Sequence, residues 1–250
     1  MRTELNAIGC SVHGVDAAAI TATDLQALRQ LLYENRLIVL KQQTLGEREY
    51  CDFAKAFISP TPEAQASSRH REHPLITVAL PTHENGRLPR GWHSETSYER
   101  VPKVISMLLP KAQPHALACC TRFIDMSDVY AALPKEIGDR LARSQLLHGH
   151  RRTDTVKLVR HPAVITHPHT RERILYLNRA FTIGVADHPE PEATAFLNRF
   201  FDFAESPRFV REVHWSPGDL AIWDNRFFQH DWTPAPAGAI IPASIQGRWA

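Results

Sequence analysis

One stretch near the end of the chain, Pro217-Gly-Asp-Leu-Ala-Ile-Trp-Asp-Asn-Arg-Phe-Phe-Gln-His230, decides the fold. Residues 216–219 are a Pro-Gly turn signal, and the segment 219–223, apolar after Asp219, is typical of a short strand. The polar residues 224–226 come next, and their side chains can bond to the backbone of a strand turn. The stretch therefore predicts a strand, a turn and a second segment that delivers His230 at a fixed angle.

A second stretch, Gly91-Trp-His-Ser-Glu-Thr-Ser-Tyr98, places an imidazole and a carboxylate two residues apart. On an extended backbone, His93 and Glu95 project from the same face. An H-x-E pair alone is common on protein surfaces, but here hydroxyl side chains surround it and His230 follows the Trp-Asp-Asn-Arg string. We therefore predict that His93, Glu95 and His230 form a catalytic two-histidine, one-carboxylate metal triad, which leaves three coordination positions open.

The first part of the chain has the pattern of an α/β scaffold. Thr23 precedes leucines at helical spacing, which predicts an N-capped helix over 24–32. A short apolar strand is expected at 37–40, and a helix at 47–57, where large apolar residues recur at helical spacing. Between about residues 69 and 91, Pro, Asn and Gly interrupt any periodic run, which predicts a long irregular connection of the kind that often covers active sites.

Short apolar segments punctuated by Pro and Gly dominate the rest of the chain, and they predict a β-sandwich or barrel with inserted helices. We find no repeat, low-complexity tract or linker, so a single domain over residues 1–250 is expected. The expected strands cover 103–109, 117–124, 145–149, 163–167, 174–177, 209–213 and 219–223, and the expected helices lie near 127–143 and 190–205.

The composition is that of an ordinary globular domain, with 43% hydrophobic and 22% charged residues. Lys plus Arg number 29 and Asp plus Glu number 27, so the net charge of +2 provides no broad field for nucleic acid or an anionic membrane. The first ten residues lack a signal-peptide pattern, and no run reaches the roughly eighteen apolar residues of a spanning helix. We expect a soluble, cytoplasmic protein without nucleic-acid or membrane partners.

Cysteine and most histidine residues have ordinary structural interpretations. The four cysteines form no C-x-x-C pair, so we interpret them as reduced thiols. Eight of the fourteen histidines lie in polar surroundings and are expected in solvated loops, namely His13, His70, His73, His83, His115, His167, His169 and His188.

These motifs resemble the TauD/TfdA (taurine dioxygenase) family of Fe(II)/2-oxoglutarate-dependent oxygenases. The resemblance runs from the helix and strand over 25–40 through Trp92-His-Ser-Glu95, Thr166-His-Pro-His169 and 175–182 to the stretch that ends at His230. It implies an α+β fold with a double-stranded β-helix (jelly-roll) core and flanking helices. It also implies bound Fe(II), with 2-oxoglutarate and O₂ as co-substrates, and it allows a homo-oligomer. The family usually has Asp where this chain has Glu95.

The resemblance also suggests roles for residues outside the triad. Thr121 and Arg248, the only Arg after His230, are the expected contacts of 2-oxoglutarate, since a guanidinium clamps a carboxylate bidentately. The alternatives are a strand threonine whose hydroxyl meets solvent and a frayed terminal arginine. Expected substrate contacts are Arg90, Tyr98, His150 and Phe181, and the family's second arginine, which holds the substrate anion, has no counterpart.

The implied reaction oxidises a small metabolite and releases succinate and CO₂. Amino acids or related zwitterions and anions are the expected substrates, and hydroxylation, desaturation and cyclisation are the expected outcomes. One alternative is a protein that binds a small molecule on the same scaffold without turnover, because the contacts to 2-oxoglutarate are incomplete. A zinc hydrolase built on the same three ligands is a further alternative, but no general base stands out beside them.

Overall fold

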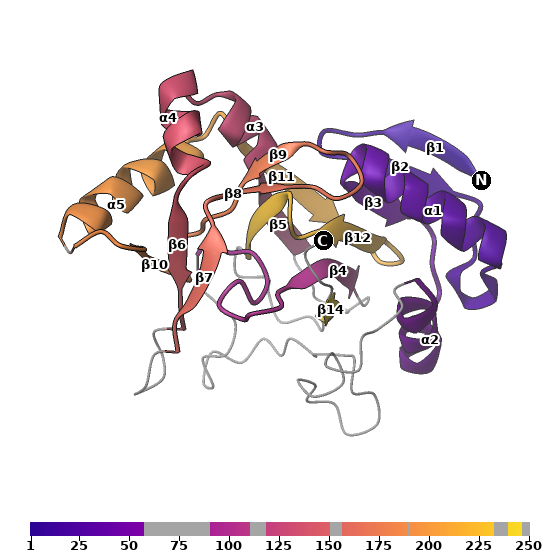
Figure 1. Ribbon diagram of the computed structural model, residues 1–250. Helices are drawn as coiled ribbons and strands as arrows, with labels where there is room; N and C mark the ends of the chain where they lie inside the picture. The colour runs from indigo at the N-terminus through magenta and orange to yellow at the C-terminus, as the bar shows by residue number, and fades with distance from the viewer. Residues whose placement is uncertain (58–90, 111–118, 151–156, 190, 233–239, 247–250) are drawn as a thin grey trace.

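The computed structural model describes residues 1–57, 91–110, 119–150, 157–189, 191–232 and 240–246 (Figure 1). The predicted irregular connection over 69–91 therefore lies almost wholly outside the described residues. None of the described helices is both long and apolar enough to cross a bilayer. The helices are the 3-10 turn η1 (Ala17–Ala19), α1 (Ala22–Asn35), α2 (Glu47–Phe57), α3 (Met126–Ala131), α4 (Lys135–Leu141) and α5 (Glu192–Ala204).

The larger of the two principal sheets has six strands in the order β1-β2-β3-β12-β4-β14, and α1 lies beside its β1–β3 part (Figure 1). All neighbours are antiparallel except β2 and β3, which are parallel. The strands are β1 (Arg2–Leu5), β2 (Cys10–His13), β3 (Leu37–Leu40), β12 (Leu220–Asp224), β4 (Lys103–Pro110) and β14 (Ile240–Gln246).

Strand β3 shows how this sheet separates two hydrophobic cores. Leu37 and Val39 pack into the cluster between the principal sheets, whereas Ile38 and Leu40 pack into the cluster beneath α1 and α2. Successive strand residues point to opposite faces, so a strand with both faces covered must be apolar throughout. This explains why Leu37–Leu40 is an uninterrupted apolar run.

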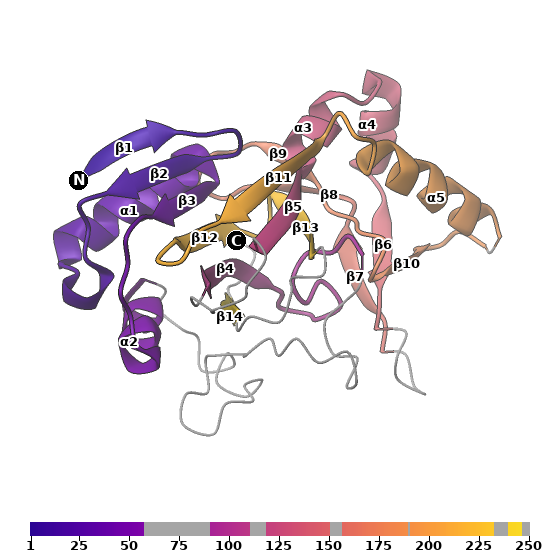
Figure 2. The ribbon, with the colours of Figure 1, turned by 180° about the vertical axis from the view of Figure 1, so that it is seen from behind.

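The opposing sheet is antiparallel and has the order β11-β5-β13, and its strand β11 crosses in front of β12 in the view of Figure 2. Phe123 of β5 contacts Trp223 of β12 edge-on, with ring centroids 5.5 Å apart, so the two sheets share a core. The remaining strands form the sheets β10-β6-β7 and β8-β9. Their bounds are β5 (Cys119–Asp125), β6 (Gln145–His148), β7 (Val159–Pro162), β8 (Val164–Thr166), β9 (Arg173–Leu175), β10 (Thr182–Val185), β11 (Val210–Trp215) and β13 (Phe228–Trp232).

Facing sheets with helices packed outside confirm the predicted α+β class, with two local corrections. The cap of α1 is Thr21, not Thr23, because the Thr21 hydroxyl accepts the backbone N–H of Asp24 at 3.1 Å. The helix expected near 127–143 is two helices, since Pro134 lies at the N-cap of α4 and cannot continue α3. Among the cysteines whose side chains are described, Cys10, Cys51 and Cys120, none is in a disulfide.

Candidate active site

The two histidines of the predicted triad lie side by side because their backbones are hydrogen-bonded to each other. The N–H of His93 donates to the carbonyl of His230 at 3.1 Å, and the N–H of His230 donates to the carbonyl of His93 at 2.8 Å. Directly opposed residues of an antiparallel pair project to the same side. The two imidazole centroids are consequently only 4.3 Å apart.

Glu95 reaches the same point from a turn. The prediction of an extended backbone from 93 to 95 holds for His93 alone, because Glu95 begins a turn in which Thr96 has a φ of 50°. The Ser94 hydroxyl donates to the carbonyl of Phe228 at 2.9 Å, which anchors the start of this turn on β13. Glu95 Oε1 lies 3.6 Å from His93 Nε2 and 3.4 Å from His230 Nε2. The donor atoms of the three side chains lie within 4.8 Å of one another.

The electrostatics favour the protonation states that a metal requires. Burial raises the pKa of Glu95, but the adjacent imidazoles of His230 and His93 outweigh it and hold the pKa well below its usual range. Burial and the neighbouring His93 lower the pKa of His230 to about 4, against the opposing effect of Glu95. A carboxylate beside a neutral imidazole is the form in which these groups ligate metal ions.

The orientation of His93 also fits a metal ligand. Its Nδ1 lies 2.9 Å from the carbonyl of Gly91, so Nδ1 carries the proton and donates it. The lone pair is then on Nε2, which is buried and makes no hydrogen bond within the described residues. A ligating histidine commonly has this arrangement, with one ring N–H held by a carbonyl and the other nitrogen aimed at the metal.

Thr121 lies on the inner face of β5, the face that looks towards the triad. It is two residues before Phe123, which pairs with His230 in the register of β5 and β13. Its side chain is fully buried, and its hydroxyl accepts the indole N–H of Trp215 at 2.8 Å. The alternative of a hydroxyl in solvent is therefore wrong. With its lone pair engaged by Trp215, the hydroxyl keeps its own proton to donate.

Three of the four expected substrate contacts gather beside His93. The ring of Tyr98 lies 4.7 Å from that of Phe181 and 5.0 Å from that of His150, centroid to centroid. The Phe181 ring lies edge-on to His93 at 6.2 Å. These rings form one wall next to the triad. Arg90 and Arg248 lie outside the described residues.

A buried polar network that the sequence analysis did not identify holds this wall in place. The Asn178 side-chain amide donates to the Ser97 hydroxyl at 2.8 Å, and Nδ1 of His148 lies 3.1 Å from the same oxygen. The Asn178 side-chain oxygen accepts the backbone N–H of Phe181 at 3.0 Å. Burial lowers the pKa of His148 to about 3, so its imidazole is neutral. The only sequence signal was the position of Asn178 within the 175–182 stretch that carries the resemblance.

The guanidinium group of Arg122 links the two segments that carry His93 and His230. Arg122 of β5 forms an ion pair with Asp231, the residue after His230. Its guanidinium carbon also lies 5.2 Å from the ring centroid of Trp92, the residue before His93. Arg122 therefore contacts both neighbours of the paired histidines without reaching the triad.

The polar string 224–226 behaves as predicted, but His167 does not. The Asp224 carboxylate accepts the backbone N–H of Arg226 at 2.9 Å, and the Asn225 amide donates to the Ser106 hydroxyl at 2.7 Å, which fixes the turn before β13. His167 was expected in a solvated loop, but its side chain is fully buried and its Nε2 lies 3.1 Å from the Asp224 carboxylate. The sequence could not show that a carboxylate 57 residues away supplies its partner.

Comparison with known proteins identifies the family of this chain. Residues 3–240 match the model of the taurine catabolism dioxygenase TauD, TfdA family. The chain belongs to this family. TauD/TfdA membership confirms the predicted resemblance, the oxygenase class, and the use of Fe(II) with 2-oxoglutarate and O₂. It also leaves no ground for the zinc hydrolase alternative.

Individual TauD/TfdA relatives are distant in sequence. An alpha-ketoglutarate-dependent sulfonate dioxygenase of Saccharomyces cerevisiae is 24% identical, over 90% of this chain and 61% of its own. An (S)-phenoxypropionate/alpha-ketoglutarate-dioxygenase of Sphingobium herbicidovorans is 26% identical, over 90% of this chain and 86% of its own. The substrates in these names differ, so the relatives leave the substrate class of this chain open.

Solved structures confirm the jelly-roll core. A taurine dioxygenase from Burkholderia xenovorans has a TM-score of 0.82 at 24% identity and covers 98% of this chain and 90% of its own. AAD-2 in complex with Mn(II) and N-oxalylglycine has a TM-score of 0.81 at 21% identity and covers 100% of both chains.

We predict that the Arg122→Met variant binds Fe(II) about 10- to 100-fold more weakly, the usual cost of removing a group that orients metal ligands. The reason is that Trp92 and Asp231 lose the cation that links them. Anaerobic Fe(II) titration measures the effect. Arg160→Met is a matched control, because the ion pair that Arg160 forms with Asp187 at 3.4 Å is exposed to solvent. Equal affinities for the two variants would exclude a positioning role for Arg122.

Proposed function

We propose that this chain is an Fe(II)/2-oxoglutarate-dependent dioxygenase of small metabolites in which His93, Glu95 and His230 hold the iron. The observation that carries the proposal is the convergence of three donor atoms within 4.8 Å at a point where both imidazoles are fully buried. Two nitrogens and one carboxylate oxygen are the donor set of non-haem Fe(II) oxygenases. Three ligands on one side leave the opposite positions for 2-oxoglutarate and O₂.

The residues around the triad then have distinct tasks. Iron bound there would supply the oxidant together with 2-oxoglutarate and O₂, and succinate and CO₂ would be released. The Thr121 hydroxyl, held by Trp215, would donate a hydrogen bond to the far carboxylate of 2-oxoglutarate. The wall formed by Tyr98, His150 and Phe181 holds the substrate next to the iron and excludes water. The protein orients the reactants, and the metal and co-substrate provide the chemistry.

Arg248 is the proposed clamp on the far carboxylate of 2-oxoglutarate. No other arginine follows His230, and β14 carries no Lys or Arg between Ile240 and Gln246. We predict that Arg248→Ala raises the KM for 2-oxoglutarate about 10- to 100-fold, as expected for loss of a charge-assisted hydrogen bond. Succinate release against 2-oxoglutarate concentration measures it. A change confined to the KM of the substrate would mean that Arg248 has a different role.

The proposed substrate is an amino acid or a related zwitterion or anion. The aromatic wall beside the triad suits a small molecule, and Arg90, three residues before His93, is the proposed partner of its carboxylate. Sulfonates and phenoxypropionate appear in the names of relatives, and these acids carry the same charge. Hydroxylation, desaturation and cyclisation remain the three proposed outcomes.

Two experiments test the function. Anaerobic addition of Fe(II) and 2-oxoglutarate should produce a weak visible charge-transfer band, because a chelated keto acid accepts electron density from the iron. A screen of succinate release across amino, sulfonic and phenoxyalkanoic acids should then identify the substrate, and mass spectrometry its product. Absence of both the band and any succinate would favour the alternative, a protein that binds a small molecule without turnover.

A further inference from the structure

A second group of metal-binding side chains lies on the sheet β11-β5-β13. Cys120 of β5 is directly opposite His214 of β11 in the antiparallel register, and Glu212 is two residues before His214. Opposed residues and residues two apart on a strand project from the same face. The three side chains therefore meet on one face, although they come from segments about 90 residues apart in the chain.

The donor atoms of this group are as close together as those of the triad. One ligand atom from each of Cys120, Glu212 and His214 lies within 4.8 Å of the other two. His214 Nε2 and Glu212 Oε1 are 3.0 Å apart. Cys120 is 9% exposed, whereas the side chains of His214 and Glu212 are 64% and 50% exposed, so the thiol forms the floor of a group that opens to solvent.

This group is separate from the triad. Thr121 and Phe123 alternate with Cys120 along β5 and face the sheet interior, where Phe123 packs with His230 at 6.1 Å between ring centroids. Cys120 therefore points to the opposite face of β5. Arg122 shares the outer face and pairs in register with Glu212, but its guanidinium forms an ion pair with Asp231, so its charge is compensated there.

The donor types indicate which ion would fit. A thiolate, an imidazole and a carboxylate together suit Zn²⁺, which takes four tetrahedral ligands from sulfur, nitrogen and oxygen. Mg²⁺ and Ca²⁺ prefer oxygen donors and would gain nothing from the thiol. Three protein ligands leave the fourth position of zinc to a water molecule. Coordination would release the thiol proton to solvent, since only the thiolate ligates.

We propose that Cys120, Glu212 and His214 form a second metal site, for Zn²⁺ or another thiophilic divalent ion, that cross-links β11 to β5. Strand β5 carries Thr121 and pairs on its other edge with β13, which carries His230. An ion held here stabilises the sheet that supports the active site, because a ligand that binds only the folded state raises its stability by mass action.

Cobalt(II) titration of the His93→Ala variant tests the proposal, since cobalt reports its ligands by its spectrum and that variant lacks the intact triad. A thiolate-to-cobalt charge-transfer band in the near ultraviolet is expected, saturating at one ion per chain and lost when Zn²⁺ is added. The triad contains no sulfur, so its occupation cannot produce this band. The Cys120→Ser change in the same background should remove the band completely.

Surface variants keep the test independent of any folding defect in Cys120→Ser. His214→Ala and Glu212→Gln should each weaken cobalt binding by at least the roughly 10- to 100-fold that loss of a ligand-orienting group costs. Cys51→Ser and His188→Ala are the controls: burial raises the pKa of the Cys51 thiol to about 11, and His188 is exposed and distant in sequence. A missing band, a band that survives Cys120→Ser, or unchanged affinity in His214→Ala and Glu212→Gln would each overturn the proposal.

Discussion

Replacing either His93 or His230 with alanine is expected to abolish both Fe(II) binding and 2-oxoglutarate decarboxylation. Each change removes one of two nitrogen donors whose rings lie 4.3 Å apart, and the two protein ligands that remain cannot retain the ion against water. The backbone hydrogen bonds between the two residues survive the change, so the fold should persist. Iron content after anaerobic loading and succinate release measure the two losses.

His188→Ala is the control for this prediction, because His188 is exposed. It should bind iron and form succinate as the unmodified protein does. Turnover that persists in either the His93 or the His230 variant would refute the proposed triad.

Replacing Asp224 with alanine is expected to lower the free energy of unfolding far more than replacing an exposed aspartate does. The Asp224 carboxylate is 1% exposed and is the ion-pair partner of Arg226, which is 6% exposed, and it also accepts a hydrogen bond from His167. Its removal leaves a buried guanidinium without its charge partner, which typically costs about 3–5 kcal/mol. Proteins of this size unfold at a cost of about 5–15 kcal/mol, so the change should be plain in urea denaturation.

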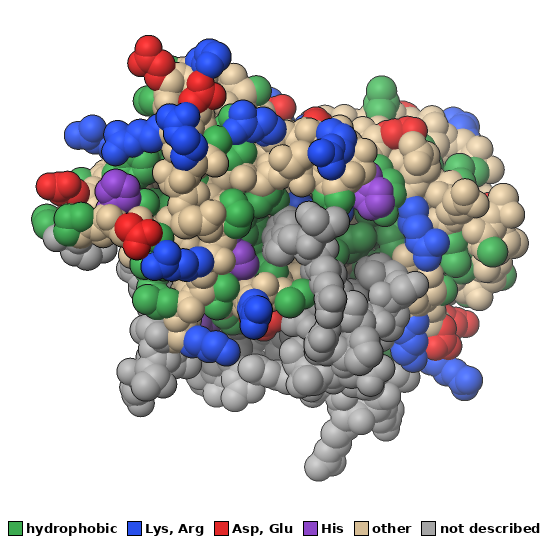
Figure 3. All heavy atoms as spheres, viewed as in Figure 1, with side chains coloured by type: hydrophobic (Ala, Val, Ile, Leu, Met, Phe, Trp, Pro, Cys, Tyr) green, Lys and Arg blue, Asp and Glu red, His purple; other side chains and the backbone are tan. Residues whose placement is uncertain are grey.

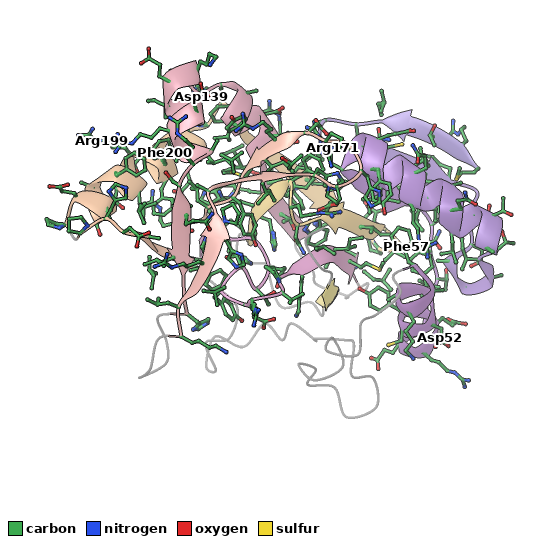
Figure 4. The ribbon with its side chains drawn as sticks, in the orientation of Figure 1. Asp52, Phe57, Asp139, Arg171, Arg199 and Phe200 are labelled. Carbon is green, nitrogen blue, oxygen red and sulfur yellow. The ribbon has the colours of Figure 1, made fainter. Side chains whose placement is uncertain are left out.

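Asp139→Ala is the matched control. Asp139 lies on α4, at the periphery of the protein (Figure 4), and its carboxylate bonds to the exposed Lys135 at 2.6 Å. Its loss should leave the unfolding midpoint almost unchanged, since exposed ion pairs contribute little. Equal midpoint shifts in the two variants would show that the Asp224 pair is not a stabilising element.

The same carboxylate should make stability depend on pH. Burial raises the pKa of Asp224, but the charge and hydrogen bonds of Arg226 and His167 outweigh it, so its pKa in the folded state lies below the usual value. Its contribution is therefore fully present above the ordinary pKa of aspartate and is lost as the pH falls through the depressed value. Asp224→Asn should be less stable at neutral pH and should lose less stability on acidification.

The elements that sequence patterns predicted well are those whose pattern is dictated by burial. Leu37–Leu40 is apolar throughout because both of its faces are covered. Pro217 and Gly218 indicate the turn that precedes β12, which begins at Leu220. The three side chains of the triad were predicted together because hydroxyl side chains surround His93 and Glu95 and because His230 follows the Trp-Asp-Asn-Arg string, and their role as iron ligands remains a prediction. Charged side chains of both signs are interspersed on the face shown in Figure 3, as the small net charge suggested.

The features that were missed depend on partners distant in the sequence. The terminal strand β1 is exposed at every residue, so no apolar alternation marked it. His167 and His148 are buried because Asp224, Ser97 and Tyr176 surround them in space, and none of these is adjacent in the chain. The single-domain organisation and a cytoplasmic location remain predictions.

The pair of backbone hydrogen bonds between His93 and His230 has a consequence for dynamics. An ion held by both imidazoles would join the two segments through their side chains, so the main chains can separate here only if at least one of these ligands leaves the ion. Iron loading and local opening at this bridge are thus linked, because iron binding raises the free energy that is needed to open the bridge. The backbone amides of these two residues should exchange with deuterium more slowly in the iron-loaded protein, while those of the exposed strand β1 should exchange at the same rate in both forms.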